Sequence, residues 1–147
     1  QLSNPRRAVS GLDSGRVGMV LAVLSSRGGY KLGDCDIYAA TVGGVRLSEP
    51  AADLAVALAV ESAFTGLALP PDLIAVGEVG LSADVRPVTA VSRRLLEASR
   101  LGFTRALVPV DAGIATPPRG MRVTEVADLG MALAAVRALQ PLPRSQS

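Results

Sequence analysis

The chain has 147 residues, of which 49% are hydrophobic and 3% aromatic, and its formal net charge is +2. This length predicts one domain with a substantial core, and no apolar run reaches the length of a membrane span without an interruption by Glu, Pro or Gly. No signal peptide is recognisable, and the single cysteine, Cys35, excludes an internal disulfide and fits a reducing compartment.

The first half of the chain predicts a helix, a strand and a second helix. Asp13 as N-cap and Gly28-Gly29 as the stop predict a helix over Ser14–Arg27, with a strand pair as the alternative because valine is frequent there. The residues of Asp34–Arg46 predict a long strand. Pro50 suits the first turn of a helix over Pro50–Phe64. This helix is apolar on nearly all sides, so we expect it to be buried at the centre of the domain.

The second half alternates strands and helices. The expected elements are a buried strand Leu73–Gly80 with its hairpin partner Val85–Val88, a helix Ala90–Leu101, a strand Arg105–Pro109, a loop Asp111–Gly120, a strand Arg122–Val126, and a helix from Asp128 to about Ala138. Together they predict an α/β (α+β) domain in which the central helix packs on a mixed sheet. We expect residues 1–13 to be a lead-in, 14–139 the domain and 140–147 a polar tail.

Basic residues are concentrated near the start of the chain. The first 31 residues contain one acid, Asp13, and these basic residues: Arg6, Arg7, Arg16, Arg27 and Lys31. A basic end on a nearly balanced domain predicts an anionic partner, and a solvated surface is the alternative interpretation.

The residue types available restrict the chemistry. Because the chain has no histidine and one cysteine, it lacks Ser-His and Cys-His nucleophile systems and an ordinary structural zinc site. A GxxxxGK[ST] phosphate-binding loop is also missing. Glu78 with Asp53 or Glu61 could act as acid and base, although scattered acids are more often solvated or salt-bridged. A Ser-Lys dyad needs a shielded lysine, and the only lysine, Lys31, stands in a glycine-rich turn.

Five segments stand in an order that is typical of one family. They are NPRRAVSGLDSGR, VGGVRLSEPAADLAVALA, PPDLIAVGEVGL, VRPV and RRLLEASRLGF. With these segments, which extend over roughly residues 4 to 139, the chain resembles the C-terminal Lon-protease-like domain of the RadA (Sms) family of bacterial DNA repair proteins. The resemblance implies the Lon-protease-domain fold.

The same resemblance implies that the protease dyad is missing. In Lon, the helix that carries the serine opens with Gly-Pro-Ser-Ala-Gly, whereas here the corresponding residues are Glu49-Pro50-Ala51-Ala52-Asp53. Ala51 therefore stands at the position of the nucleophile. The position of the Lon lysine falls on Ser92. We expect a protease fold without protease chemistry.

The family also implies what the parent protein does. It resembles a ring-forming, ATP-dependent DNA helicase that acts with the RecA recombinase in branch migration during homologous recombination. ATP with Mg²⁺, and zinc, are then expected only in a missing N-terminal part, with residues 1–13 leading in from its ATPase domain. This domain is expected to support a homo-oligomer, a hexameric ring, and to bind single-stranded or branched DNA without sequence specificity. The implied location is the bacterial cytoplasm at the nucleoid, without membrane contact.

Contact with DNA phosphates requires long cationic side chains on an exposed surface. Arg6 and Arg7 precede the first helix, Arg16 lies in its first turn, where a cation opposes the helix dipole, and Arg86 stands at the end of the hairpin. We expect these four residues to bind DNA. The alternative is salt bridges on the surface, Arg86 with Asp84 and Arg16 with Asp13. Three further arginines could serve a helix face or a subunit interface: Arg93, Arg94 and Arg100.

Two other functions remain open at this point. One is a pure oligomerisation scaffold, in which the arginines serve subunit interfaces and DNA affinity is small. The other is a cryptic peptidase, whose peptide hydrolysis would be lost on changing Ser92 or Ser48.

Overall fold

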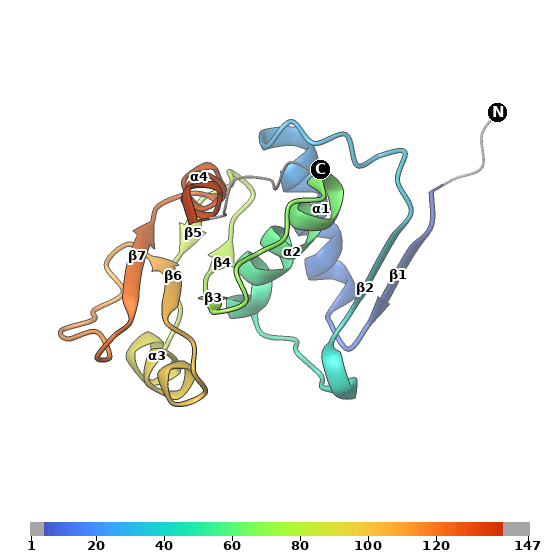
Figure 1. The fold of residues 1–147 in the computed structure, drawn as a ribbon. Coiled ribbons are helices and arrows are strands. Elements are labelled where there is room, and N and C mark those ends of the chain that lie inside the picture. Colours follow the sequence, from blue (N-terminus) through green and yellow to red (C-terminus); the bar gives the residue numbers. More distant parts are fainter. Residues whose placement is uncertain (1–4, 140–147) are drawn as a thin grey trace, which may run out of the picture.

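The computed structural model describes residues 5–139, and Figure 1 shows helices interspersed with strands along the chain. The elements are β1 (Arg7–Ser10), α1 (Ser14–Arg27), β2 (Ile37–Ala40), α2 (Asp53–Thr65), β3 (Leu73–Ala75), β4 (Glu78–Val79), β5 (Val85–Arg86), α3 (Val91–Arg100), β6 (Arg105–Pro109), β7 (Arg122–Val126) and α4 (Leu129–Leu139). The mixed α/β class is therefore confirmed. The expected tail 140–147 lies outside the described residues, as do residues 1–4.

The helix α1 has the predicted bounds and the predicted caps. The Asp13 carboxylate accepts the backbone N–H of Arg16 at 2.9 Å, and the N–H of Gly28 donates to the carbonyl of Leu24 at 3.1 Å. The alternative of a strand pair is wrong, because the valines of this segment lie on the buried face of the helix. α1 connects β1 to β2, which pair in parallel. Part of the expected lead-in, Arg7–Ser10, is thus a strand of the fold.

The predicted strand Asp34–Arg46 is wrong in its length. β2 ends at Ala40, and a short 3₁₀ turn over Val42–Gly44 follows. Gly43 and Gly44 adopt positive φ angles of 75° and 74°, which only glycine adopts without strain, so the Gly-Gly pair turns the chain away from the sheet.

The expected burial of the central helix is only partly correct. Pro50–Ala52 form a 3₁₀ turn, and α2 continues to Thr65, where Gly66 ends it in the left-handed region. One side of α2 is buried against α1 and the strands, whereas Ala55, Ala59, Ala63 and Phe64 are exposed. The alanine-rich sequence is compatible with burial on every side, but no described segment covers this face.

The second half builds a parallel sheet of order β3-β6-β7. Alternate residues of β6 serve two cores: Leu107 packs with α2 and α4, while Ala106 and Val108 pack against α3. Figure 1 shows α3 and α4 on opposite sides of this sheet. β6 and β7 have the predicted bounds. Both ends of α3 and of α4 lie within one residue of the predicted helix ends.

The predicted strand Leu73–Gly80 is divided at Val76-Gly77. β3 joins the parallel sheet, while β4 pairs with β5 as the predicted hairpin, which is shorter than expected. Between β3 and β4, the Gly77 N–H donates to the carbonyl of Ala51 at 3.0 Å, and the Gly77 carbonyl accepts the N–H of Leu54 at 3.0 Å. These two bonds attach the start of α2 to the hairpin and position the candidate site.

Candidate functional site

The start of α2 carries a buried carboxylate. Asp53 is 2% exposed and lies in the first turn, where a negative charge meets the positive end of the helix dipole. Its Oδ1 accepts Arg16 Nε at 2.9 Å, and its Oδ2 accepts Arg16 Nη2 at 2.6 Å and the Val79 N–H at 3.1 Å. The hydrogen bond to Asp53 raises the pKa of Arg16. Through these hydrogen bonds Asp53, in α2, is connected to Arg16 of α1 and to Val79 of β4.

The hairpin extends this cluster toward the surface. Glu78 lies 3.5 Å from Arg16 and is paired in register with Arg86, whose Nε donates to Asp84 at 2.9 Å. That hydrogen bond lowers the pKa of the Asp84 carboxyl. The cluster places three carboxylates against two guanidinium groups. Its net charge is therefore negative, which does not favour a bound phosphate.

The four arginines predicted to contact DNA do not form one patch. Arg16 and Arg86 lie in the cluster just described. Arg7 is at the start of β1, where its guanidinium donates to the backbone carbonyls of Arg6, Cys35 and Leu32, the last at 2.9 Å. Arg6 lies beside it, and its side chain has no hydrogen bond or ion pair among residues 5–139. The alternative pairing of Arg86 with Asp84 is present, whereas the guanidinium of Arg16 pairs with Asp53 rather than with Asp13.

The two residues predicted to stand at the dyad positions differ in their surroundings. Ala51 is buried, 4% exposed, and its carbonyl accepts the Gly77 N–H. Ser92 is exposed in the first turn of α3, and Lys31 is exposed in the loop that follows α1. The carboxylates considered as an acid–base pair are held by guanidinium groups: Asp53 and Glu78 by Arg16, and Glu61 by Arg137 at 3.0 Å.

Sequence reasoning missed two arginine–glutamate pairs. Arg94 donates two hydrogen bonds to Glu49, of 2.8 and 3.1 Å. The pair attaches α3 to the residue before the 3₁₀ turn that leads into α2. Arg137 donates to Glu61, which is 2% exposed, and to the hydroxyl of Tyr30. No local pattern could identify these partners, because they lie 45 and 76 residues apart in the chain.

A group of exposed cations gathers at one end of the β1–α1–β2 unit. β1 starts where α1 ends, and the bonds from Arg7 to Leu32 and Cys35 hold the following loop against β1. This basic end consists of Arg6, Arg7, Arg27 and Lys31, and Arg16 lies at the opposite end of α1. Arg6, Arg27 and Lys31 form no ion pair within the described part of the chain.

Comparison with known proteins identifies the family. The model of the Lon protease (S16) C-terminal proteolytic domain matches residues 26–117, more than half of the chain. The chain belongs to this family. It is also 50% identical over 133 residues to the DNA repair protein RadA of Mycolicibacterium smegmatis, which covers 90% of this chain and 28% of that protein. The corresponding identities are 47% over 137 residues for RadA of Brucella abortus and 46% over 135 residues for RadA of Pseudomonas aeruginosa.

The resemblance to the Lon-like domain of RadA is thereby confirmed. In the three relatives the match covers 28%, 29% and 30% of their length, so the chain spans less than a third of each. No helix within residues 5–139 is long and apolar enough to cross a membrane. In the same residues, no group of three or more Cys, Asp or Glu side chains is placed to hold a metal ion.

Proposed function

We propose that the chain is the non-proteolytic Lon-like domain of a RadA-type repair protein that contributes to ring assembly and DNA binding. The observation that carries this proposal is the similarity to RadA proteins over nine-tenths of the chain. In this proposal the parent is a cytoplasmic ATP-dependent helicase that acts with RecA in branch migration. ATP with Mg²⁺, and zinc, bind in other parts of it. The homo-oligomer is a hexameric ring.

The contacts at the start of α2 support the absence of proteolysis. A serine protease of the Lon type requires a nucleophile and a lysine that activates it. Here the Ala51 side chain has no nucleophilic group, and the first turn of α2 beside it carries Asp53, which is paired with Arg16. Ser92 is exposed in α3 and the only lysine, Lys31, is exposed in the loop after α1, so the requirement for a shielded dyad is not met.

For DNA contact, the basic end is a better candidate than the cluster at α2. Arg16 and Arg86 are neutralised by nearby carboxylates, and releasing Arg16 would leave Asp53 buried without its cation. The side chains of Arg6, Arg27 and Lys31 form no ion pair among the described residues, although Asp36 accepts the Arg6 backbone N–H at 2.7 Å. Arg7 holds the loop after α1 against β1. With two phenylalanines and two tyrosines in the chain, the interaction is expected to rest on phosphates rather than on base stacking.

A salt titration of single-stranded DNA binding tests this surface. We would compare the wild-type chain with an Arg6/Arg27/Lys31→Ala variant, and with Arg100→Ala, whose cation pairs with Glu97 on an exposed helix face, as the control. Loss of the three cations should weaken binding and reduce the slope of log K against log salt by about 2, or about 0.7 per lost phosphate contact. The control should retain most of its affinity.

Light scattering on the same samples separates DNA contact from assembly. The pure scaffold remains the second candidate, because the internal bonds of Arg7, Arg16 and Arg86 make these arginines less available to DNA. It is supported if the wild-type chain forms a ring without binding DNA, or if the triple variant dissociates. Peptide hydrolysis that is lost on changing Ser92 or Ser48 would instead indicate a cryptic peptidase and contradict both proposals.

A further inference from the structure

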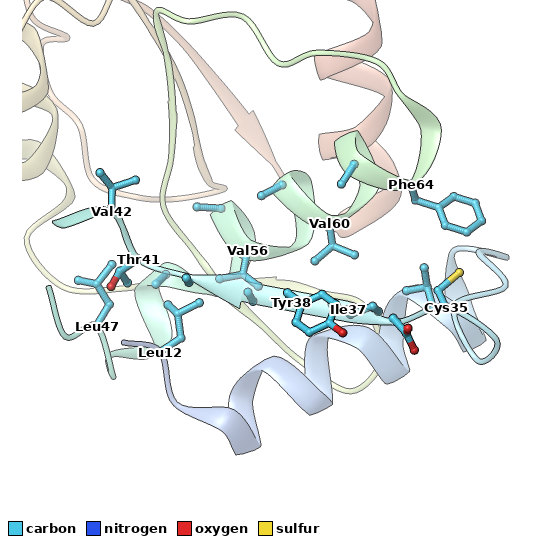
Figure 2. A pocket seen from close by; sticks show the side chains of 18 of the residues that line it. Leu12, Cys35, Ile37, Tyr38, Thr41, Val42, Leu47, Val56, Val60 and Phe64 are labelled. Atoms are coloured by element: carbon cyan, nitrogen blue, oxygen red, sulfur yellow. The ribbon is translucent and has the colours of Figure 1, made fainter. Parts of the chain in front are cut away.

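An open groove of about 920 Å³ lies between α2 and β2, with Phe64 at one end and Val42 at the other (Figure 2). One wall is the side of α2 that the fold leaves uncovered. Its lining residues recur with the helical period and are small or β-branched: Ala52, Ala55, Val56, Ala59, Val60 and Ala63. Figure 2 shows Val56 and Val60 pointing toward β2.

The other wall is the edge of β2. Successive side chains of a strand point to opposite faces of its sheet, yet all four residues of β2 line the groove, so the strand meets it edge-on. The N–H groups of Ile37 and Thr41 donate toward β1, to Arg6 at 2.8 Å and Ser10 at 3.1 Å. In a parallel ladder the alternate residues, Tyr38 and Ala40, then direct their N–H and carbonyl groups to the opposite edge. Within the described residues this sheet has no third strand.

Large apolar side chains are exposed around the same groove. Val42 is 93% exposed, Tyr38 65% and Phe64 44%, and Val45 and Leu47 are also exposed. Asp36 is the one charged residue of the described lining. Folded proteins protect apolar surface next to a free strand edge, because such an edge otherwise pairs with other chains.

We propose that the groove holds an apolar β-strand from the part of the polypeptide outside these 147 residues, hydrogen-bonded to the free edge of β2 and packed on α2. A strand is the occupant that uses both walls, since it satisfies the backbone groups of Tyr38 and Ala40 while its side chains contact the alanines of α2. The added strand also enlarges a two-stranded parallel sheet, which is marginal by itself.

Two observations favour the same polypeptide as the source. The RadA relatives are more than three times as long as the matched segment, so a protein of this type has ample further chain. A surface this apolar also suits a permanent contact, because transient interfaces are more polar. The proposal uses the RadA-type parent of the proposed function but does not depend on DNA contact.

Hydrogen exchange of individual β2 amides tests the proposal. In the 147-residue chain, we expect fast exchange at Tyr38 and Ala40 and protection at Ile37, Ala39 and Thr41, which face β1. In the full-length gene product, exchange at Tyr38 and Ala40 should slow by at least about tenfold, independently of protein concentration. Fast exchange at both amides in the full-length protein would overturn the proposal. Protection that disappears on dilution would also overturn it, because the occupant would then be a second copy.

A proline scan across β2 gives an independent readout. Ala40→Pro removes an N–H that has no partner among residues 5–139, so the melting temperature of the 147-residue chain should change little. In the full-length protein the same substitution should restore fast exchange at Tyr38. Ala39→Pro is the matched control, because it removes an N–H that faces β1 and should destabilise both proteins. Continued protection of Tyr38 in the full-length Ala40→Pro protein would contradict a strand in the groove.

Discussion

Replacing Asp53 should reveal how strongly the start of α2 is held. Asp53→Ala removes both hydrogen bonds from Arg16 and leaves the Val79 N–H without an acceptor. The lost charge-assisted bonds are expected to contribute about 1.5–3 kcal/mol, and the orphaned buried N–H about 1–3 kcal/mol. Since the Arg16 side chain is 29% exposed and can be rehydrated, we expect a loss near the lower end, about 3 kcal/mol.

Urea denaturation followed by circular dichroism measures this loss as a change in the free energy of unfolding. For a domain of this size, about 3 kcal/mol corresponds to a decrease in Tm of about 6–12 °C. Asp53→Asn keeps an acceptor for Val79 but loses the charge, so its effect should be intermediate. Glu97→Ala, which removes an exposed pair with Arg100, is the control and should change the free energy by less than about 0.5 kcal/mol. An Asp53→Ala variant within about 1 kcal/mol of wild type would refute this account of the site.

Three further results are expected. The hydrogen bond from Arg94 lowers the pKa of Glu49 below its ordinary value, so this pair stabilises the fold above the ordinary pKa of a glutamate, and the contribution disappears as pH falls through the lowered pKa. Glu49→Gln should therefore reduce the decrease in Tm between about pH 6 and about pH 3. Gly77→Ala would place a Cβ 2.7 Å from Val85 Cγ1, and calorimetry should show a destabilisation of about 1–3 kcal/mol. Gly18→Ala, in α1 with no atom beyond the adjacent helix backbone within 4 Å of the new Cβ, should instead raise the free energy of unfolding by about 0.5–1 kcal/mol. A loss in this variant would contradict the open surface assigned to that position.

Elements that depend on nearby residues were predictable. Asp13 and Gly28 bound α1 because their caps satisfy backbone groups within a few positions, and Asp128 does the same for α4 by accepting the Met131 N–H at 2.8 Å. The β4–β5 hairpin also depends on a short turn. The Lon-like family could be recognised for a similar reason, since its motifs are contiguous segments.

Elements that depend on distant neighbours were not predictable. The segment Asp34–Arg46 has strand-forming residues throughout, but only Ile37–Ala40 finds a partner, β1. The alanines and valines of α2 show only that the helix is apolar. Burial also requires a segment that covers the helix, and one side of α2 lacks such a segment among the described residues.

The candidate site shows the same division. By itself, the sequence predicts, through the family resemblance, that Ala51 and Ser92 stand where a Lon-type protease has its dyad, because side-chain identity is a local property. The tertiary structure alone decided which charges meet from distant parts of the chain. Arg16 was a plausible phosphate ligand until the fold brought Asp53 within 2.6 Å, and a guanidinium held by a buried carboxylate gains little by exchanging it for a solvated phosphate. The energy of an ion pair depends on the distance between its charges, so partners that are distant in the sequence are specified only after helices and strands have packed.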